Sequence, residues 1–139
     1  MMLSQCTHGF GMCGKGIAVA RILVIDDEEL FREILVAGLS AKGHDVATAD
    51  GGEAGIAMAR AQTPEIVITD LSMPNVTGWD VIRALKADAA TQDTPMIALS
   101  AHEKAGDRDE AFTAGCDAYE TKPLDLSRLG AKIDELLAG

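Results

Sequence analysis

The segment IVITDLSMPNVTGWD, residues 66–80, decides the fold of this chain. Its apolar start is typical of a strand that is buried on both faces of a sheet, and an acidic residue, Asp70, follows that strand at once. A weaker helical pattern comes next, near Trp79–Ala87. An apolar strand followed by a helix is the repeating unit of parallel α/β sheets, so the segment predicts that class of fold.

The same alternation of apolar runs and helical stripes extends along the chain in both directions. Three stripes predict helices whose apolar side faces a core, and Lys104–Ala114 is a weaker helical pattern like the one near Trp79. The expected strands are Arg21–Ile25, Asp45–Ala49, Glu65–Thr69, Met96–Ser100 and Ala118–Glu120. The stripes are Leu30, Phe31, Ile34, Leu35 and Leu39, then Ala54, Ala57, Met58 and Ala61, and last Leu126, Leu129, Ile133 and Leu136.

The order of these elements predicts a three-layer α/β sandwich of the flavodoxin-like (βα)5 type. The first, third and fourth strands are almost wholly apolar, so we expect them in the centre, and the two mixed strands at the edges. Right-handed crossovers then give a five-stranded parallel sheet of order 2-1-3-4-5.

Polar side chains stand where the apolar strands stop. Asp26 and Asp27 follow ILVI, Asp70 follows IVIT, Ser100 follows MIAL, and Lys122 lies in YETKP. In open parallel sheets the ligand site lies outside the carboxyl ends of the strands, so these five side chains are expected in one pocket. Clustered carboxylates repel one another unless a cation neutralises them, and hard oxygen ligands suit Mg²⁺. The pattern therefore predicts a site for Mg²⁺ and a phosphoryl group.

This arrangement, with DLSMPNVTGWD beginning at Asp70 and KP at Lys122, resembles the receiver domain of response regulators in two-component signalling. The resemblance covers roughly Ala20 to Leu137. It implies that Asp70 accepts a phosphoryl group from the phosphohistidine of a sensor histidine kinase or a histidine phosphotransfer protein. It also implies Mg²⁺, with Mn²⁺ as an alternative. The implied metal ligands are Asp26, Asp27, Asp70 and the backbone carbonyl of Ser72, with Asp26 acting through water or by orientation.

The resemblance assigns further roles. Lys122 is the counter-ion of the phosphoryl group, Ser100 donates its hydroxyl to a phosphoryl oxygen, and the Lys122–Pro123 bond is expected to be cis. Ser100 and Tyr119 form the implied switch, in which the aromatic ring turns inward as Ser100 moves toward the phosphate. The changed surface would then bind a downstream protein through the fourth predicted helix, the fifth strand and the last helix.

Size, charge and cysteine content narrow the class of protein. The chain has 139 residues and is 47% hydrophobic, which suits one domain, and we assign residues 20–139 to it. A formal net charge of −10 argues against direct nucleic-acid binding. The sequence has no apolar run near twenty residues and no leader pattern, and its 3 cysteines make no disulfide framework. These features predict a cytoplasmic protein without a membrane partner.

Residues 1–19 differ from the rest in composition and are predicted to be a disordered or cloning-derived extension. The run GFGMCGKG, Gly9–Gly16, matches most of a phosphate-binding P-loop, but Gly16 replaces the required hydroxyl residue and a strand follows instead of a helix. Cys6, His8 and Cys13 match no common zinc spacing and lack a fourth ligand.

Two other function classes compete with a phosphoacceptor. A haloacid-dehalogenase-like phosphatase also forms an aspartyl phosphate, but its usual DxD pattern is absent from both TDLS and IDDE. A phosphorylation-independent interaction module typically loses an acid or the lysine, and this chain keeps all five residues. A lone Asp after a strand is usually a helix cap or turn residue, whereas capping does not need this spacing across strands. We therefore expect a stand-alone signalling phosphoacceptor with its own autophosphorylation and autodephosphorylation chemistry, and not a metabolic enzyme.

Overall fold

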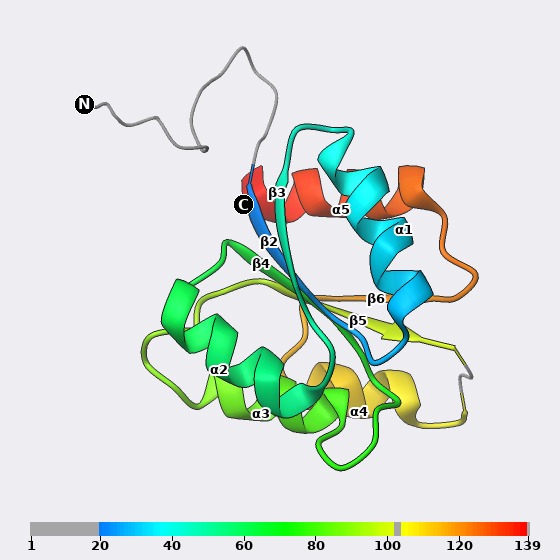
Figure 1. Ribbon diagram of the computed structural model, residues 1–139. Helices are drawn as coiled ribbons and strands as arrows, with labels where there is room; N and C mark the ends of the chain where they lie inside the picture. Colours follow the sequence, from blue (N-terminus) through cyan, green and yellow to red (C-terminus); the bar gives the residue numbers. More distant parts are fainter. Residues whose placement is uncertain (1–19, 102–103, 139) are drawn as a thin grey trace.

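A computed structural model describes residues 20–101 and 104–138. The chain alternates strands and helices in three layers, with a parallel sheet in the middle (Figure 1). The predictions for the extension 1–19, including its P-loop-like run and its Cys and His residues, lie outside the described residues. The elements are β2 (Arg21–Ile25), α1 (Glu29–Ser40), β3 (Asp45–Ala49), α2 (Gly52–Gln62), β4 (Ile66–Asp70), α3 (Gly78–Lys86), β5 (Met96–Ser100), α4 (Asp107–Ala114), β6 (Ala118–Thr121) and α5 (Leu126–Ala138).

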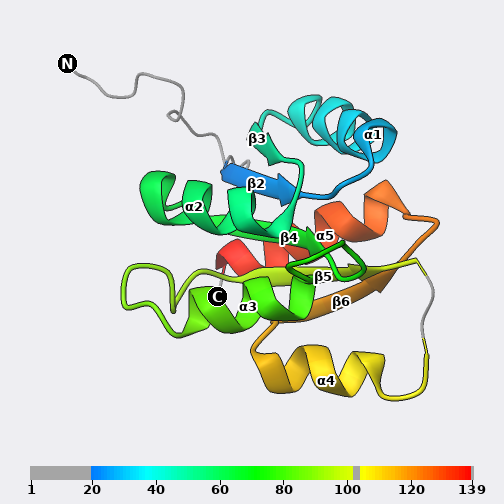
Figure 2. The same ribbon diagram turned by 60° about the horizontal axis from the view of Figure 1, so that its bottom comes forward.

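The five strands pair in the order β3-β2-β4-β5-β6, and every pairing is parallel. Counted from β2, this is the predicted order 2-1-3-4-5, so the flavodoxin-like fold is confirmed. Helices α1 and α5 cover one face of the sheet, and α2, α3 and α4 cover the other (Figures 1 and 2). Every residue of β4 and β5 is buried, as strands covered on both faces require.

The stripe predicted for α2 was mostly wrong in phase, since Met58 alone of its four members packs against the core. Ala54, Ala57 and Ala61 are exposed, and the helix instead buries Gly52, Gly55 and Ala59. A Cβ atom on Gly55 would stand 2.5 Å from Cδ1 of Ile25, so the helix can lie this close to the sheet only with glycine there. A search for apolar side chains overlooks such a face because its contacts are made by residues that have almost no side chain.

The stripe predicted for α1 was partly wrong. Leu35 and Leu39 are fully buried, whereas Leu30 and Ile34 are 64% and 47% exposed. Periodicity placed these residues on one face, but a helix that covers the margin of the sheet buries only a narrow part of that face. The stripe predicted for α5 was correct, because Leu129 and Ile133 are buried and its end members pack against them.

Four elements differ from the predictions in their bounds, and of these α3, Gly78–Lys86, lies one residue earlier than Trp79–Ala87. β4 begins at Ile66 and includes Asp70, and β6 extends to Thr121, since ladder pairing continues past the apolar run. Helix α4 begins at Asp107 instead of Lys104, because Gly106 has a φ of +91°, outside the right-handed helical region. Within the described residues no helix has the length and apolar content that crossing a membrane would need.

Candidate functional site

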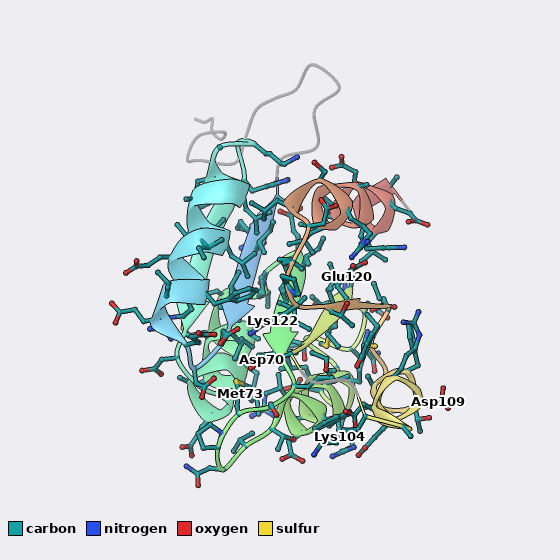
Figure 3. All side chains as sticks on the ribbon, turned by 90° about the vertical axis from the view of Figure 1, so that its right-hand side faces the viewer. Asp70, Met73, Lys104, Asp109, Glu120 and Lys122 are labelled. Atoms are coloured by element: carbon teal, nitrogen blue, oxygen red, sulfur yellow. The ribbon has the colours of Figure 1, made fainter. Side chains whose placement is uncertain are left out.

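The sheet gathers the predicted polar residues at the carboxyl ends of its strands. Asp70 ends β4 and Ser100 ends β5, while Asp26 and Lys122 directly follow β2 and β6. The backbone N–H of Lys122 donates to the carbonyl of Ser100 at 2.8 Å, which ties these two strand ends together. Figure 3 shows Asp70 and Lys122 close to each other at this end of the sheet. The cis Lys122–Pro123 bond is present as expected.

Three carboxylates form the acidic part of the site. One oxygen each from Asp26, Asp27 and Asp70 lie within 4.8 Å of one another. Asp26 and Asp70 are 1% and 4% exposed, whereas Asp27 is exposed to solvent. Like charges this close interact strongly when water is excluded, so the cluster favours a cation or a proton.

Burial and the neighbouring carboxylate of Asp26 raise the pKa of Asp70 to about 6. Asp27 acts in the same direction, while Lys122 and the backbone N–H of Leu71 act against it. The site thus disfavours the charged form of the Asp70 carboxylate. Any cation that enters the cluster lowers this pKa and favours the ionised, nucleophilic form.

Lys122 supplies the one ammonium within salt-bridge distance of the cluster among the described residues. Its Nζ lies 3.0 Å from Oδ2 of Asp26, 3.6 Å from Oδ1 of Asp70 and 4.0 Å from Oε1 of Glu28. The same Nζ stands 3.9 Å from the centroid of the Phe31 ring. With a side chain only 13% exposed, this ammonium is held from several sides.

Local structure fixes the two loops that carry the acids. Oδ1 of Asp26 accepts from the backbone N–H of Glu28 at 2.9 Å, and Nη1 of Arg32 donates to the carbonyl of Asp26 at 2.7 Å. On the other loop, Thr77 and Asp80 form a reciprocal capping box at the start of α3. These bonds hold the chain on both sides of the carboxylate cluster.

Gly78 brings the start of α3 against the end of β4. Its N–H donates to the carbonyl of Leu71 at 2.9 Å, and a Cβ atom there would collide with the carbonyl oxygen of Asp70. The close approach needs glycine, as at other points where two backbones meet. Position 78 therefore helps to fix where the Asp70 carboxylate lies.

The residues present fit a Mg²⁺ ion. Oδ1 of Asp70 is buried and accepts no hydrogen bond from any described residue, although Lys122 lies 3.6 Å away. A buried anionic oxygen without a hydrogen bond is costly unless a cation is its partner. Asp27 is exposed to solvent, and Mg²⁺ usually keeps several water ligands.

The remaining predicted site residues occupy different surroundings. Ser100 is 4% exposed and pairs in register with Thr121 beside Lys122. Ser72 is exposed in the loop after β4. Tyr119 is 6% exposed, packs in the apolar cluster under α2, α3 and α4, and has Cζ of Arg108 at 5.2 Å from its ring centroid. Its ring already lies inward in this structure.

Four residues of the site and its surroundings were not assigned there from the sequence. Periodicity places Phe31 in a core stripe, and the acid run at Asp26 is the only hint of a role for Glu28. The contacts of Arg32 and Arg108 join segments that no local pattern connects.

The chain is similar to several known proteins. A family model for the response regulator receiver domain matches residues 22–134. Response regulator PleD of Caulobacter vibrioides is 38% identical over 117 residues, which cover 84% of this chain but only 26% of PleD. Protein PilH of Pseudomonas aeruginosa is 36% identical over 121 residues, 87% of this chain and 100% of PilH. The chemotaxis protein CheY4 of Vibrio cholerae has the same fold, with a TM-score of 0.80 at 24% identity over 86% of this chain and 99% of CheY4.

Proposed function

The chain belongs to the response regulator receiver domain family, and on that basis we propose that it accepts a phosphoryl group on Asp70 in two-component signalling. The observation that carries the proposal is the set of contacts around Asp70. Its buried carboxylate lies among two further carboxylates, with an ammonium 3.6 Å away. A carboxylate can act as a covalent nucleophile when the charge of the transferring group is stabilised close by.

In the proposed reaction an oxygen of Asp70 attacks phosphorus of a phosphohistidine on a sensor kinase or a phosphotransfer protein. The new O–P bond forms as the N–P bond breaks, and the histidine nitrogen leaves with the electron pair of that bond. Lys122 turns its ammonium toward the phosphoryl oxygens, and Ser100 donates its hydroxyl to one of them. Water entering past the exposed Asp27 would later hydrolyse the acyl phosphate. The chain is a signalling phosphoacceptor in this proposal, and not a metabolic enzyme.

Asp26, Asp27, Asp70 and the backbone carbonyl of Ser72 would hold Mg²⁺, or Mn²⁺ in its place. When bound, the metal spreads the negative charge that develops on the phosphoryl oxygens. The close oxygens of the three acids and the unsatisfied Oδ1 of Asp70 support this assignment.

The proposal includes a switch and a partner. Ser100 moves toward the phosphoryl group, Tyr119 adjusts its packing, and the face of α4, β6 and α5 then binds a downstream protein in the cytoplasm instead of nucleic acid or membrane. The inward ring of Tyr119 means that its adjustment starts from a buried position.

Intact-protein mass spectrometry after incubation with Mg²⁺ and acetyl phosphate tests the proposal. We expect the wild-type chain to gain one phosphoryl group only when Mg²⁺ is present. Asp70→Asn should gain none, and Asp93→Asn should behave as wild type because Asp93 lies before β5, at the opposite end of the sheet. No gain by a folded wild-type protein would contradict the phosphoacceptor role and favour a phosphorylation-independent interaction module.

A further inference from the structure

One contact of Lys122 is made by an apolar residue that has no role in the phosphoryl transfer proposed above. The ring of Phe31, on α1, has its centroid 3.9 Å from Nζ of Lys122. Lys122 follows β6, the last strand in the sequence. The ring and the ammonium meet only because the fold brings the first helix and the last strand end together. This approach is well inside the distance at which a cation is attracted by the face of an aromatic ring.

Three carboxylates and one apolar group, the Phe31 ring, surround the ammonium within the described residues. Carboxylate oxygens of Asp26, Asp70 and Glu28 lie 3.0, 3.6 and 4.0 Å from Nζ. These oxygens attract the ammonium in different directions. Bound Mg²⁺ or a phosphoryl group would change the electrostatic attraction between each oxygen and the ammonium. The Phe31 ring is uncharged and packs against the apolar cluster under α1 and α5, so we expect it to stay in place whichever anion the ammonium contacts.

The position of the ring is itself fixed. Phe31 is partly buried, and the next residue, Arg32, donates from Nη1 to the carbonyl of Asp26 at 2.7 Å. This bond ties the first turn of α1 to the end of β2, where the acids begin. A lysine stem has four carbons and loses considerable rotamer freedom when its ammonium is held, so a fixed wall reduces the number of positions that it samples.

We propose that Phe31 is a positioning residue whose ring holds the ammonium of Lys122 over the acidic cluster. The consequence for phosphorylation rests on the proposed function: with the ring in place, Lys122 remains close to the phosphoryl group as its contacts move from Asp26 to the phosphoryl oxygens. Phe31 touches neither the donor nor the reacting atoms in this account, and it acts through Lys122 alone.

The contact can be measured without metal or phosphodonor. Protons above the face of an aromatic ring resonate upfield, so we expect upfield NMR signals for the ε-methylene protons of Lys122, assigned by their loss in Lys122→Arg. Phe31→Leu should return these signals to ordinary lysine values, while Phe31→Tyr should keep them upfield. Phe112→Leu is the matched control, since it removes an exposed aromatic ring on α4 by the same change. If Phe31→Leu fails to fold, Phe31→Met provides the comparison.

The rate of phosphorylation by acetyl phosphate and Mg²⁺ gives the second reading. We expect Phe31→Leu to be about 3- to 30-fold slower than wild type, the range that a cation–π contact provides, and Phe31→Tyr to restore the rate. Upfield signals that persist in Phe31→Leu would overturn the contact. Signals that move while the rate stays at the wild-type value would overturn the positioning role. A wild-type protein that never gains a phosphoryl group would instead contradict the proposed function, and the NMR comparison would then decide by itself whether Phe31 holds Lys122.

Discussion

At the scale of single residues, the site disfavours the ionised carboxylate of Asp70. Asp70 is 4% exposed and its pKa is raised to about 6 from an ordinary value of 3.8, first by burial and then by Asp26. Because the folded state binds the proton more tightly than the unfolded state, the ionised carboxylate opposes folding above pH 6. The opposition fades as the pH falls below 6 and is gone below about pH 4, where both states are protonated.

Asp70→Asn should therefore stabilise the metal-free protein. We expect its free energy of unfolding at pH 7 to exceed that of wild type by about 1–3 kcal/mol, and the difference to vanish toward pH 4. Urea unfolding at several pH values in the presence of a chelator measures this difference. Asp93→Asn, an exposed acid at the other end of the sheet, should show no such gain. An Asp70→Asn protein less stable than wild type at pH 7 would show that the carboxylate is not under strain.

At the scale of elements, the site depends on how closely helices α2 and α3 approach the sheet. Gly55 lies against Ile25, and Gly78 lies against the carbonyl of Asp70, so each helix meets its strand through a residue without a side chain. The capping box of Thr77 and Asp80 begins α3 one residue before this contact. Hydrogen bonding by Thr77 and Arg83 also holds the pKa of Asp80 below its ordinary value.

Gly78→Ala should move the end of β4 away from the start of α3. A Cβ atom at position 78 collides with backbone atoms, which cannot rotate aside, so we expect a loss of about 1–3 kcal/mol in urea unfolding and slower phosphorylation of Asp70. Gly51→Ala is the matched control, because a Cβ atom there would meet nothing within 4 Å. Equal stability of the two variants would contradict the close contact.

At the scale of the whole molecule, net charge and the site act together. The formal charge of −10 includes three carboxylates forced close at one edge, so a divalent cation relieves both local and general repulsion. A ligand that binds only the folded state stabilises it, by about 1.4 kcal/mol at ten times its dissociation constant. Mg²⁺ should thus raise the unfolding temperature of wild type.

A variant and a control salt separate specific binding of Mg²⁺ at the cluster from general screening of the negative charge. Asp27→Asn should lose most of the increase in unfolding temperature that Mg²⁺ causes, because it removes one carboxylate of the cluster. Asp27 is exposed, so the change should not disturb the core. NaCl at the same ionic strength should reproduce only the screening part. Differential scanning calorimetry measures the unfolding temperature in each salt. Equal increases in MgCl₂ and in NaCl for the wild-type protein would contradict a bound ion.

The sequence by itself determined the fold and predicted that five polar residues lie at one edge of the sheet. Its apolar strands had to be buried on both faces, and parallel strands that end in acids bring those acids to one edge. Asp26, Asp27, Asp70 and Lys122 meet there as expected, since strand direction and right-handed crossovers leave little freedom. The roles assigned to these residues stay predictions until phosphorylation is measured.

Only the tertiary structure decided which face of α2 is buried, which apolar residues of α1 stay exposed, and what surrounds Lys122. Periodicity records which residues share a face of a helix, but the distance between a helix and its sheet depends on atoms from both. The approach of Gly55 to Ile25 and of Phe31 to Lys122 joins residues far apart in the sequence. Such contacts leave no local pattern, because their energy exists only after the layers have packed.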